Sequence, residues 1–196
     1  MTARSGAGSD PVGHGMARRD FLKVGVGFSL MAAVAGALGS LSGCGDAVKA
    51  PAKNFVFLQN GDIALFTALA PAVVIDLVSL DSAQHAARIA DVLHNLDDTC
   101  GALDLAAGQE LRKLLDLLAI GPLRYLLTGV GAWNEASVDT LQAFLTRWRG
   151  SRFATLNAGG NVLVKLISAS YYVLPASWPA SGYPGPLAQM YRAVNS

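Results

Sequence analysis

The stretch NGDIALFTALAPAVVIDL, residues 60–77, decides the fold because it predicts one strongly apolar helix. Its large apolar side chains recur every three or four residues, which is the spacing of one helical face. Asn60-Gly61-Asp62 is a typical helix start. Pro71 should end or kink the helix, because proline lacks a backbone donor and clashes with the preceding turn. The apolar positions are Ile63, Leu65, Phe66, Leu69, Val73, Val74 and Leu77.

Helical periodicity continues on the C-terminal side of this stretch, and an apolar lead-in, residues 55–58, precedes it. No alternation of period two persists long enough to predict a sheet. The chain therefore predicts a small, irregular all-α bundle. The expected helices are a second one capped by Asp81 and Ser82, a third entered through Gly108 and Gln109, a short piece over 123–127 after the Gly121-Pro122 break, a fourth starting at 135–137, and a last one over about 161–173.

The tail departs from this pattern. Its prolines exclude a continuous helix after Leu174, and its aromatic residues are too large and apolar for an idle linker. We expect an extended arm over residues 175–196, which either grips another subunit or wraps its own bundle. The prolines are Pro175, Pro179, Pro184 and Pro186, and the aromatic residues are Trp178, Tyr183 and Tyr191.

Composition limits the classes of function. Hydrophobic residues make up 52% of the chain and charged residues only 15%, which favours a partner surface on the mature part. The formal net charge is +1, so nothing here predicts a nucleic-acid partner. The expected organisation is a disordered leader and signal over 1–44, a linker over 45–54, the bundle over 55–174 and the arm over 175–196.

The front of the chain resembles an export signal. Arg18 and Arg19, followed by Phe21, Leu22 and Lys23, match the twin-arginine pattern, and an uncharged apolar run over 24–41 comes next. The twin-arginine (Tat) translocon exports proteins that have already folded, so we expect a periplasmic protein. A membrane anchor that begins with two arginines is the alternative.

The end of this segment, Leu41-Ser42-Gly43-Cys44, resembles a lipobox. Cys44 would then become the first mature residue and would carry the acyl chains that tether the protein to a membrane. The alternative is ordinary cleavage nearby, for instance after Gly39 or Ala50. Lipidation of Cys44 excludes a disulfide with Cys100, the other cysteine of the chain, and we expect the Cys100 thiol to be buried.

The sequence contains no strong catalytic, cofactor or metal motif. His85 and His94 lack a third ligand at metal spacing, and solvated helix-end charges explain Asp97 and Asp98 better than a metal does. Gly129-Val130-Gly131 lacks the third glycine of a dinucleotide loop, and Gly159-Gly160 is expected to be a helix entry. We therefore expect no catalytic residue, cofactor or metal in this chain. Folded export normally serves cofactor proteins, so the cofactor is expected in a partner.

Two stretches carry a family resemblance. Residues 65–74, LFTALAPAVV, and the tail over 171–186, with Tyr171-Tyr172, Pro175-Ala176-Ser177-Trp178 and Gly182-Tyr183-Pro184-Gly185-Pro186, resemble gluconate 2-dehydrogenase subunit 3. In that family the large subunit, of the glucose-methanol-choline (GMC) oxidoreductase type, carries FAD and the chemistry. A cytochrome c subunit with haem c often takes the electrons. Val74-Ile75-Asp76 and the lipobox depart from the usual pattern of the family.

The resemblance implies a non-catalytic small subunit. Such a subunit would escort, stabilise and membrane-tether a folded FAD-dependent dehydrogenase. Two alternatives remain: a free-standing periplasmic lipoprotein that binds a small apolar ligand, and an enzyme built around His85 or His94. The residues expected at the partner interface are Trp178, Tyr183, Pro184, Gly185 and Pro186.

Overall fold

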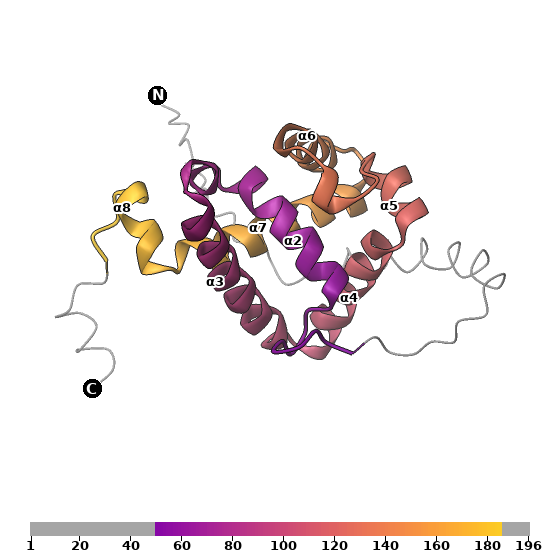
Figure 1. The fold of residues 1–196 in the computed structure, drawn as a ribbon. Coiled ribbons are helices and arrows are strands. Elements are labelled where there is room, and N and C mark those ends of the chain that lie inside the picture. Colours follow the sequence, from indigo (N-terminus) through magenta and orange to yellow (C-terminus); the bar gives the residue numbers. More distant parts are fainter. Residues whose placement is uncertain (1–49, 186–196) are drawn as a thin grey trace, which may run out of the picture.

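The computed structural model describes residues 50–185, and every regular element in that range is helical. The all-α prediction is confirmed. Among these residues no helix combines the length and the apolar character needed to cross a membrane. The elements are α2 (Asn60–Val73), η1 (Ile75–Ser79), α3 (Ser82–Gly101), α4 (Leu105–Ala119), α5 (Gly121–Thr128), η2 (Trp133–Glu135), α6 (Val138–Arg149), α7 (Ala154–Tyr172), η3 (Pro175–Ser177) and α8 (Trp178–Ser181) (Figure 1).

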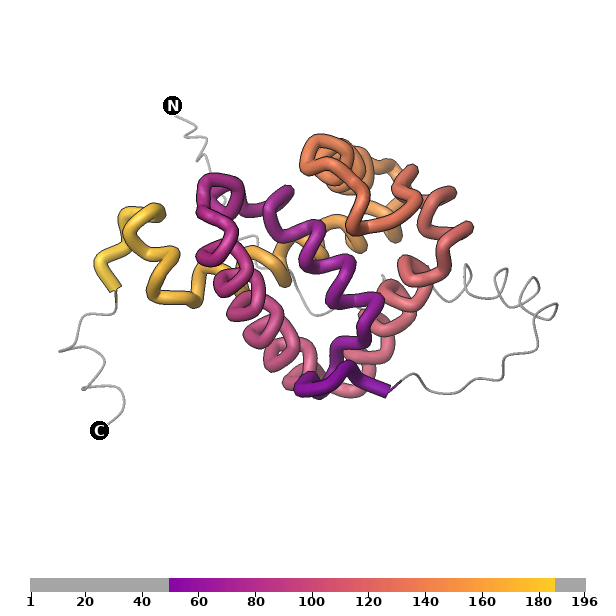
Figure 2. The backbone as a smooth tube through the Cα atoms, in the orientation of Figure 1, coloured from indigo at the N-terminus to yellow at the C-terminus, as the bar shows by residue number. Residues whose placement is uncertain are grey.

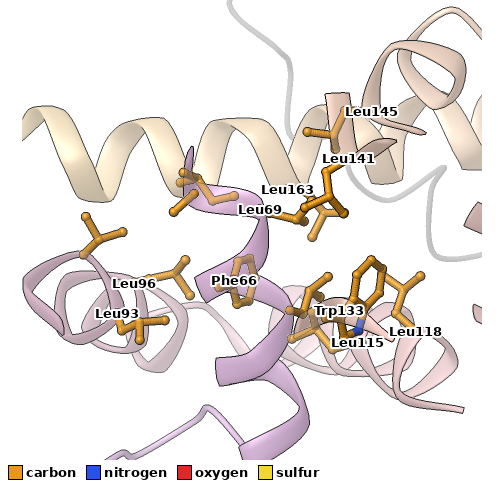
Figure 3. Packing of buried hydrophobic residues seen from close by; sticks show 14 of the residues in the cluster. Phe66, Leu69, Leu93, Leu96, Leu115, Leu118, Trp133, Leu141, Leu145 and Leu163 are labelled. Carbon is orange, nitrogen blue, oxygen red and sulfur yellow. The ribbon is translucent and has the colours of Figure 1, made fainter. Parts of the chain in front are cut away.

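Helix α2 is the central element. It contacts α3, α4, α6 and α7, and in Figure 2 it runs between α3 on one side and α4 on the other, while α8 lies apart. Phe66 and Leu69 are fully buried on it, and Figure 3 shows them among leucines from all four neighbours. The helix runs two residues past Pro71 and ends at Val73, as the missing proline donor predicts. An apolar surface of this extent gives the short helices around it a common core.

Three helix starts are fixed by side chains that accept a backbone N–H from the first turn. Asp81 caps α3, as predicted, through the N–H of Gln84 at 2.9 Å. Asp104 caps α4 in the same way, so the expected entry at Gly108 was wrong and Gly108 lies inside the first turn. The third cap is Ser137 on α6.

The glycine pair 159–160 is also placed differently from the prediction. It lies inside α7, which begins at Ala154, and is not a helix entry. A Cβ at Gly160 would stand 3.0 Å from the Cβ of Trp148 and 3.3 Å from the backbone nitrogen of Arg149. Glycine is present there because α6 and α7 pack closely at this point, not because the helix begins there.

The lead-in before α2 is held by a buried carboxylate. Asp97, only 4% exposed on α3, accepts the backbone N–H groups of Val56, Phe57 and Leu58 at 2.7, 2.8 and 2.8 Å. The prediction that Asp97 is a solvated helix-end charge was therefore wrong. Its carboxylate supplies the acceptors that an irregular, partly buried backbone segment needs.

A second buried carboxylate joins α2 to α4. Asp62 is 1% exposed and receives two hydrogen bonds from the guanidinium of Arg112, at 2.6 and 2.8 Å. Asp62 also accepts the N–H of Gln59 at 2.8 Å, which completes the start of α2. The paired charges compensate one another, so the carboxylate can lie inside the bundle.

The C-terminal arm is less extended than expected. The prolines do stop a continuous helix after α7, but residues 175–181 form helical turns, η3 and α8, before the chain opens at Gly182. Pro175 and Pro179 stand in the first turns of these short elements, where a missing N–H costs nothing.

Replacing Asp97 tests whether its carboxylate holds the lead-in in place. Asp97→Ala leaves three backbone donors without their carboxylate, so we expect the free energy of unfolding to fall by about 2–4 kcal/mol in a urea titration. The neighbouring Asp98 is exposed on the same helix, and Asp98→Ala should change stability by less than about 0.5 kcal/mol. Equal effects from the two changes would contradict the assigned role of Asp97.

Two glycine substitutions test the packing of α7. Gly160→Ala should destabilise the protein by about 1–3 kcal/mol, because the new methyl group presses on the α6 backbone. Gly108→Ala is the matched change in an open helical site, where the nearest atom would be Phe57 Cε2 at 3.9 Å. It should stabilise α4 by about 0.5–1 kcal/mol. Thermal unfolding of both variants measures the difference, and a stabilised Gly160→Ala would refute the close approach.

Candidate partner interface

Three residues of the arm form a local structure that we call the aromatic clasp: Trp178, Tyr183 and Gly185. The rings of Trp178 and Tyr183 meet edge to face, with centroids 5.4 Å apart and planes at 81°. The indole Nε1 donates to the backbone oxygen of Tyr172 at 3.2 Å, which ties the clasp to the end of α7. The arm therefore folds back on itself over residues 172–185.

The glycines of the tail are required by this geometry. Gly182 has a left-handed φ of 69° and ends α8, while its N–H donates to the oxygen of Pro179 at 3.2 Å. Gly185 has a φ of 88°, and a Cβ there would stand 2.9 Å from Cζ3 of Trp178. Gly185 thus has no room for a side chain, whereas Gly182 has open space around it and favours glycine through its φ alone.

The clasp separates the residues predicted at the interface into exposed and covered ones. Tyr183 and Pro184 are exposed, Trp178 is half-buried and Gly185 is buried. Pro186 lies outside the described residues, as does Tyr191. Trp178 thus orders the arm, and Tyr183 is the aromatic side chain that it presents outward.

Four further exposed apolar residues lie at the same end of the bundle and were not predicted. Tyr172 and Val173 follow the last buried turn of α7, and Ile75 and Val78 belong to η1. The carboxylate of Asp76 lies beside the Tyr171 hydroxyl, which brings η1 against the end of α7. We call these four residues and Tyr183 the apolar end.

The apolar end holds five of the eleven large hydrophobic side chains that are exposed within residues 50–185. Their exposed fractions run from 49% to 67%. The residues come from two segments almost one hundred positions apart, so helical periodicity in the sequence could not group them. The sequence did contain one sign of this exposed surface: the apolar pattern continues through Tyr172 and Val173, beyond the last position that α7 buries.

The apolar end adjoins a buried tyrosine, Tyr171, and the charged side chain of Asp76. Burial raises the pKa of the Tyr171 hydroxyl, and the negative charge of Asp76 raises it further, while Arg88 acts in the opposite direction. The tyrosine therefore stays protonated throughout the physiological range.

The histidines considered as a metal site have separate roles. His85 Nδ1 lies 2.9 Å from the backbone oxygen of Leu77, and the His94 ring packs edge to face with Phe55 at 5.1 Å. Within the described range, no three His, Cys, Asp or Glu side chains gather in a way that could hold a metal ion. The histidines thus contact η1 and the lead-in respectively, and do not converge on one point.

Cys100 is buried, as predicted, and its thiol is free. Burial raises its pKa to about 12, and the negative charges of Asp97 and Asp62 add to that shift. A thiol with this pKa is protonated at neutral pH and is a poor nucleophile. Cys100 is therefore a small core residue.

Two hollows on the surface are open to solvent. One lies over the loop after α5, where Gly129 takes a left-handed φ of 77° and its N–H donates to the Tyr125 oxygen. The other lies between α2, α6 and α7, beside Val73 and Gln142. Neither gathers more than one charged side chain: Glu135 lines the first and Arg149 the second.

Gly185→Ala tests the clasp. The added methyl group would collide with the Trp178 ring at a φ that alanine rarely adopts, so the ring should leave its site. We expect the indole N–H resonance of Trp178 to move toward that of a free indole in an ¹⁵N correlation spectrum. The unfolding midpoint should change little, because the clasp lies outside the main core. Gly131→Ala, with open space around it, is the control, and an unmoved Trp178 resonance would refute the clasp.

The predicted signal residues Arg18, Arg19, Phe21, Leu22 and Lys23 and the predicted lipidation site Cys44 lie outside the described residues. No family model, curated protein or solved structure matches this chain. Its function is therefore inferred from its own residues and from the resemblance in residues 65–74 and 171–186.

Proposed function

We propose that this chain is a non-catalytic small subunit of an exported dehydrogenase complex. It escorts, stabilises and membrane-tethers a folded FAD-dependent large subunit of the GMC type. The observation that carries the proposal is the apolar end, which gathers five exposed apolar side chains beside an ordered aromatic arm. Exposed aromatic and aliphatic residues concentrated at one place are typical of protein–protein interfaces.

The order of the arm supports a binding role. Trp178 is fixed by a hydrogen bond, by the edge of Tyr183 and by the close approach of Gly185, so Tyr183 is held in one place. A side chain held in advance loses less conformational entropy when it is buried by a partner. Aromatic anchors of this kind often supply most of the energy of an interface.

The front of the chain supports the escort. Arg18 and Arg19 would engage the Tat translocon, and a partner bound to the folded bundle would cross with it. FAD belongs to that partner, with haem c in a third subunit where a cytochrome c is present. Cys44 would carry the lipid that keeps the complex at the periplasmic face of a membrane.

Affinity purification from periplasm and membranes of the native host tests the proposal. The tagged chain should bring down a large subunit with flavin absorbance. A triple variant of the apolar end, with Tyr172, Val173 and Tyr183 changed to Ser, should recover at least about tenfold less of it, since interface anchors contribute 2 kcal/mol or more. Changing Arg18 and Arg19 together to Lys should remove both proteins from the periplasm.

The matched control changes Tyr125 and Leu126 to Ser, because these residues are also large, apolar and exposed, but their helix α5 lies on the opposite side of the molecule from α8 (Figure 1). That variant should retain the flavoprotein. Export of the chain alone, with no flavin and no large subunit, would refute the proposed function. Equal loss of the partner in both variants would refute the assignment of the interface.

A further inference from the structure

The lead-in fixes where the chain enters the bundle. The N–H of Ala52 donates to the oxygen of Leu58 at 2.8 Å, and Asp97 holds the following backbone. The chain is therefore attached to the bundle from Ala52 onward. If Cys44 is acylated, as the proposed function requires, eight residue steps connect the lipid to this point, a reach of at most about 28 Å.

Two of the most exposed apolar side chains lie at this entry end. Val56 is 75% exposed, and its Cγ1 is 3.9 Å from where a Cβ on Gly101, the last residue of α3, would stand. Leu105 is 79% exposed and is the first residue of α4. Figure 1 shows the lead-in crossing beneath α3 and α4, at the base of the molecule, away from α8.

The backbone prevents Val56 from turning inward. Its own N–H donates to Asp97, and the next residue, Phe57, packs toward α4, where a Cβ on Gly108 would meet its ring at 3.9 Å. Because Phe57 takes the inner position, Val56 is left outside. An apolar side chain held outward beside the attachment point of a lipid is well placed to enter the lipid surface.

We propose that the entry end, with Val56 and Leu105, rests on the bilayer when Cys44 carries its lipid. The short tether keeps these side chains at a high effective concentration near the lipid, so a contact too weak for a free protein is sufficient. The apolar end, with its clasp, is then turned away from the lipid and stays available to the partner.

The charges at the entry end specify the kind of surface. Among the residues that the structure describes at this end, Asp98 and Asp104 are exposed, against one exposed cation, Lys53. These charges, two acidic and one basic, would not attract an anionic lipid surface. The contact is therefore apolar, and we expect it on zwitterionic phosphatidylcholine without help from anionic lipid.

Single-cysteine labelling of the mature, lipidated full chain tests the proposal. Val56→Cys and Leu105→Cys are labelled with a thiol-reactive, polarity-sensitive fluorophore, and the protein is reconstituted in phosphatidylcholine vesicles that contain nitroxide-labelled lipid. Cys100 does not interfere, because it is buried and protonated. Leu126→Cys is the control, because it is 78% exposed on α5, which follows the opposite end of α4.

We expect the labels at positions 56 and 105 to be quenched by the nitroxide lipid several times more strongly than the label at 126, with no increase when phosphatidylglycerol is added. Equal quenching at all three positions would overturn the proposal. So would labels at 56 and 105 that are shielded from water but not quenched, since a protein would then cover this end.

Mass spectrometry of the purified chain separates this result from the proposed function. An unacylated Cys44 would overturn both the tether and the lipid contact, whereas acylation with equal quenching overturns only the contact. Co-purification of the flavoprotein with the same labelled chain tests the escort role independently, because the labelled positions lie outside the apolar end.

Discussion

The buried carboxylate of Asp97 is the constraint on which the arrangement of the bundle depends. It accepts three successive backbone N–H groups, and the segment so held delivers Leu58 to the core, where it is fully buried. The next residue, Gln59, donates to Asp62, and Asp62 pairs with Arg112 of α4. One continuous series of polar contacts thus connects α3, the lead-in, α2 and α4. Loss of any acceptor would leave a buried group without a partner, which costs more than the contact itself contributes.

The same helix, α3, also holds the end of α7. Helix α7 packs along α3 and α6, and the side chain of Asn95 on α3 donates to the backbone oxygen of Ser170 just before the arm. Asn95 stands only two residues before Asp97, so adjacent turns of α3 hold both the end of α7 and the lead-in. Figure 1 nevertheless shows the lead-in at the base of the molecule and α8 apart from it, so the proposed lipid contact and the proposed partner interface lie at different ends.

Local patterns in the sequence were sufficient for much of the fold. The apolar spacing over residues 60–77 predicted α2, and Asp81 predicted the start of α3, because both signals lie within a few residues of their effect. Gly108 and Gly160 misled the prediction, since a glycine inside a helix has the same local appearance as one at its end. Only the neighbouring helix shows that Gly160 permits close packing. Asp97 was missed because its partners lie 39 to 41 positions away in the chain.

The candidate interface was predictable in part for the same reason. Composition identified the aromatic tail, but only the fold shows that Trp178 is used within the arm and that Ile75 and Val78 of η1 are exposed as well. A tail that was extended, as first expected, would have to become ordered when it meets its partner, and that ordering would weaken binding. The clasp is already ordered when the chain has folded, so its conformational entropy is lost before any binding. Gly182 and Gly185 allow its turns. The part of the proline- and glycine-rich tail that the structure describes is therefore an ordered, compact segment and not the extended arm that was expected.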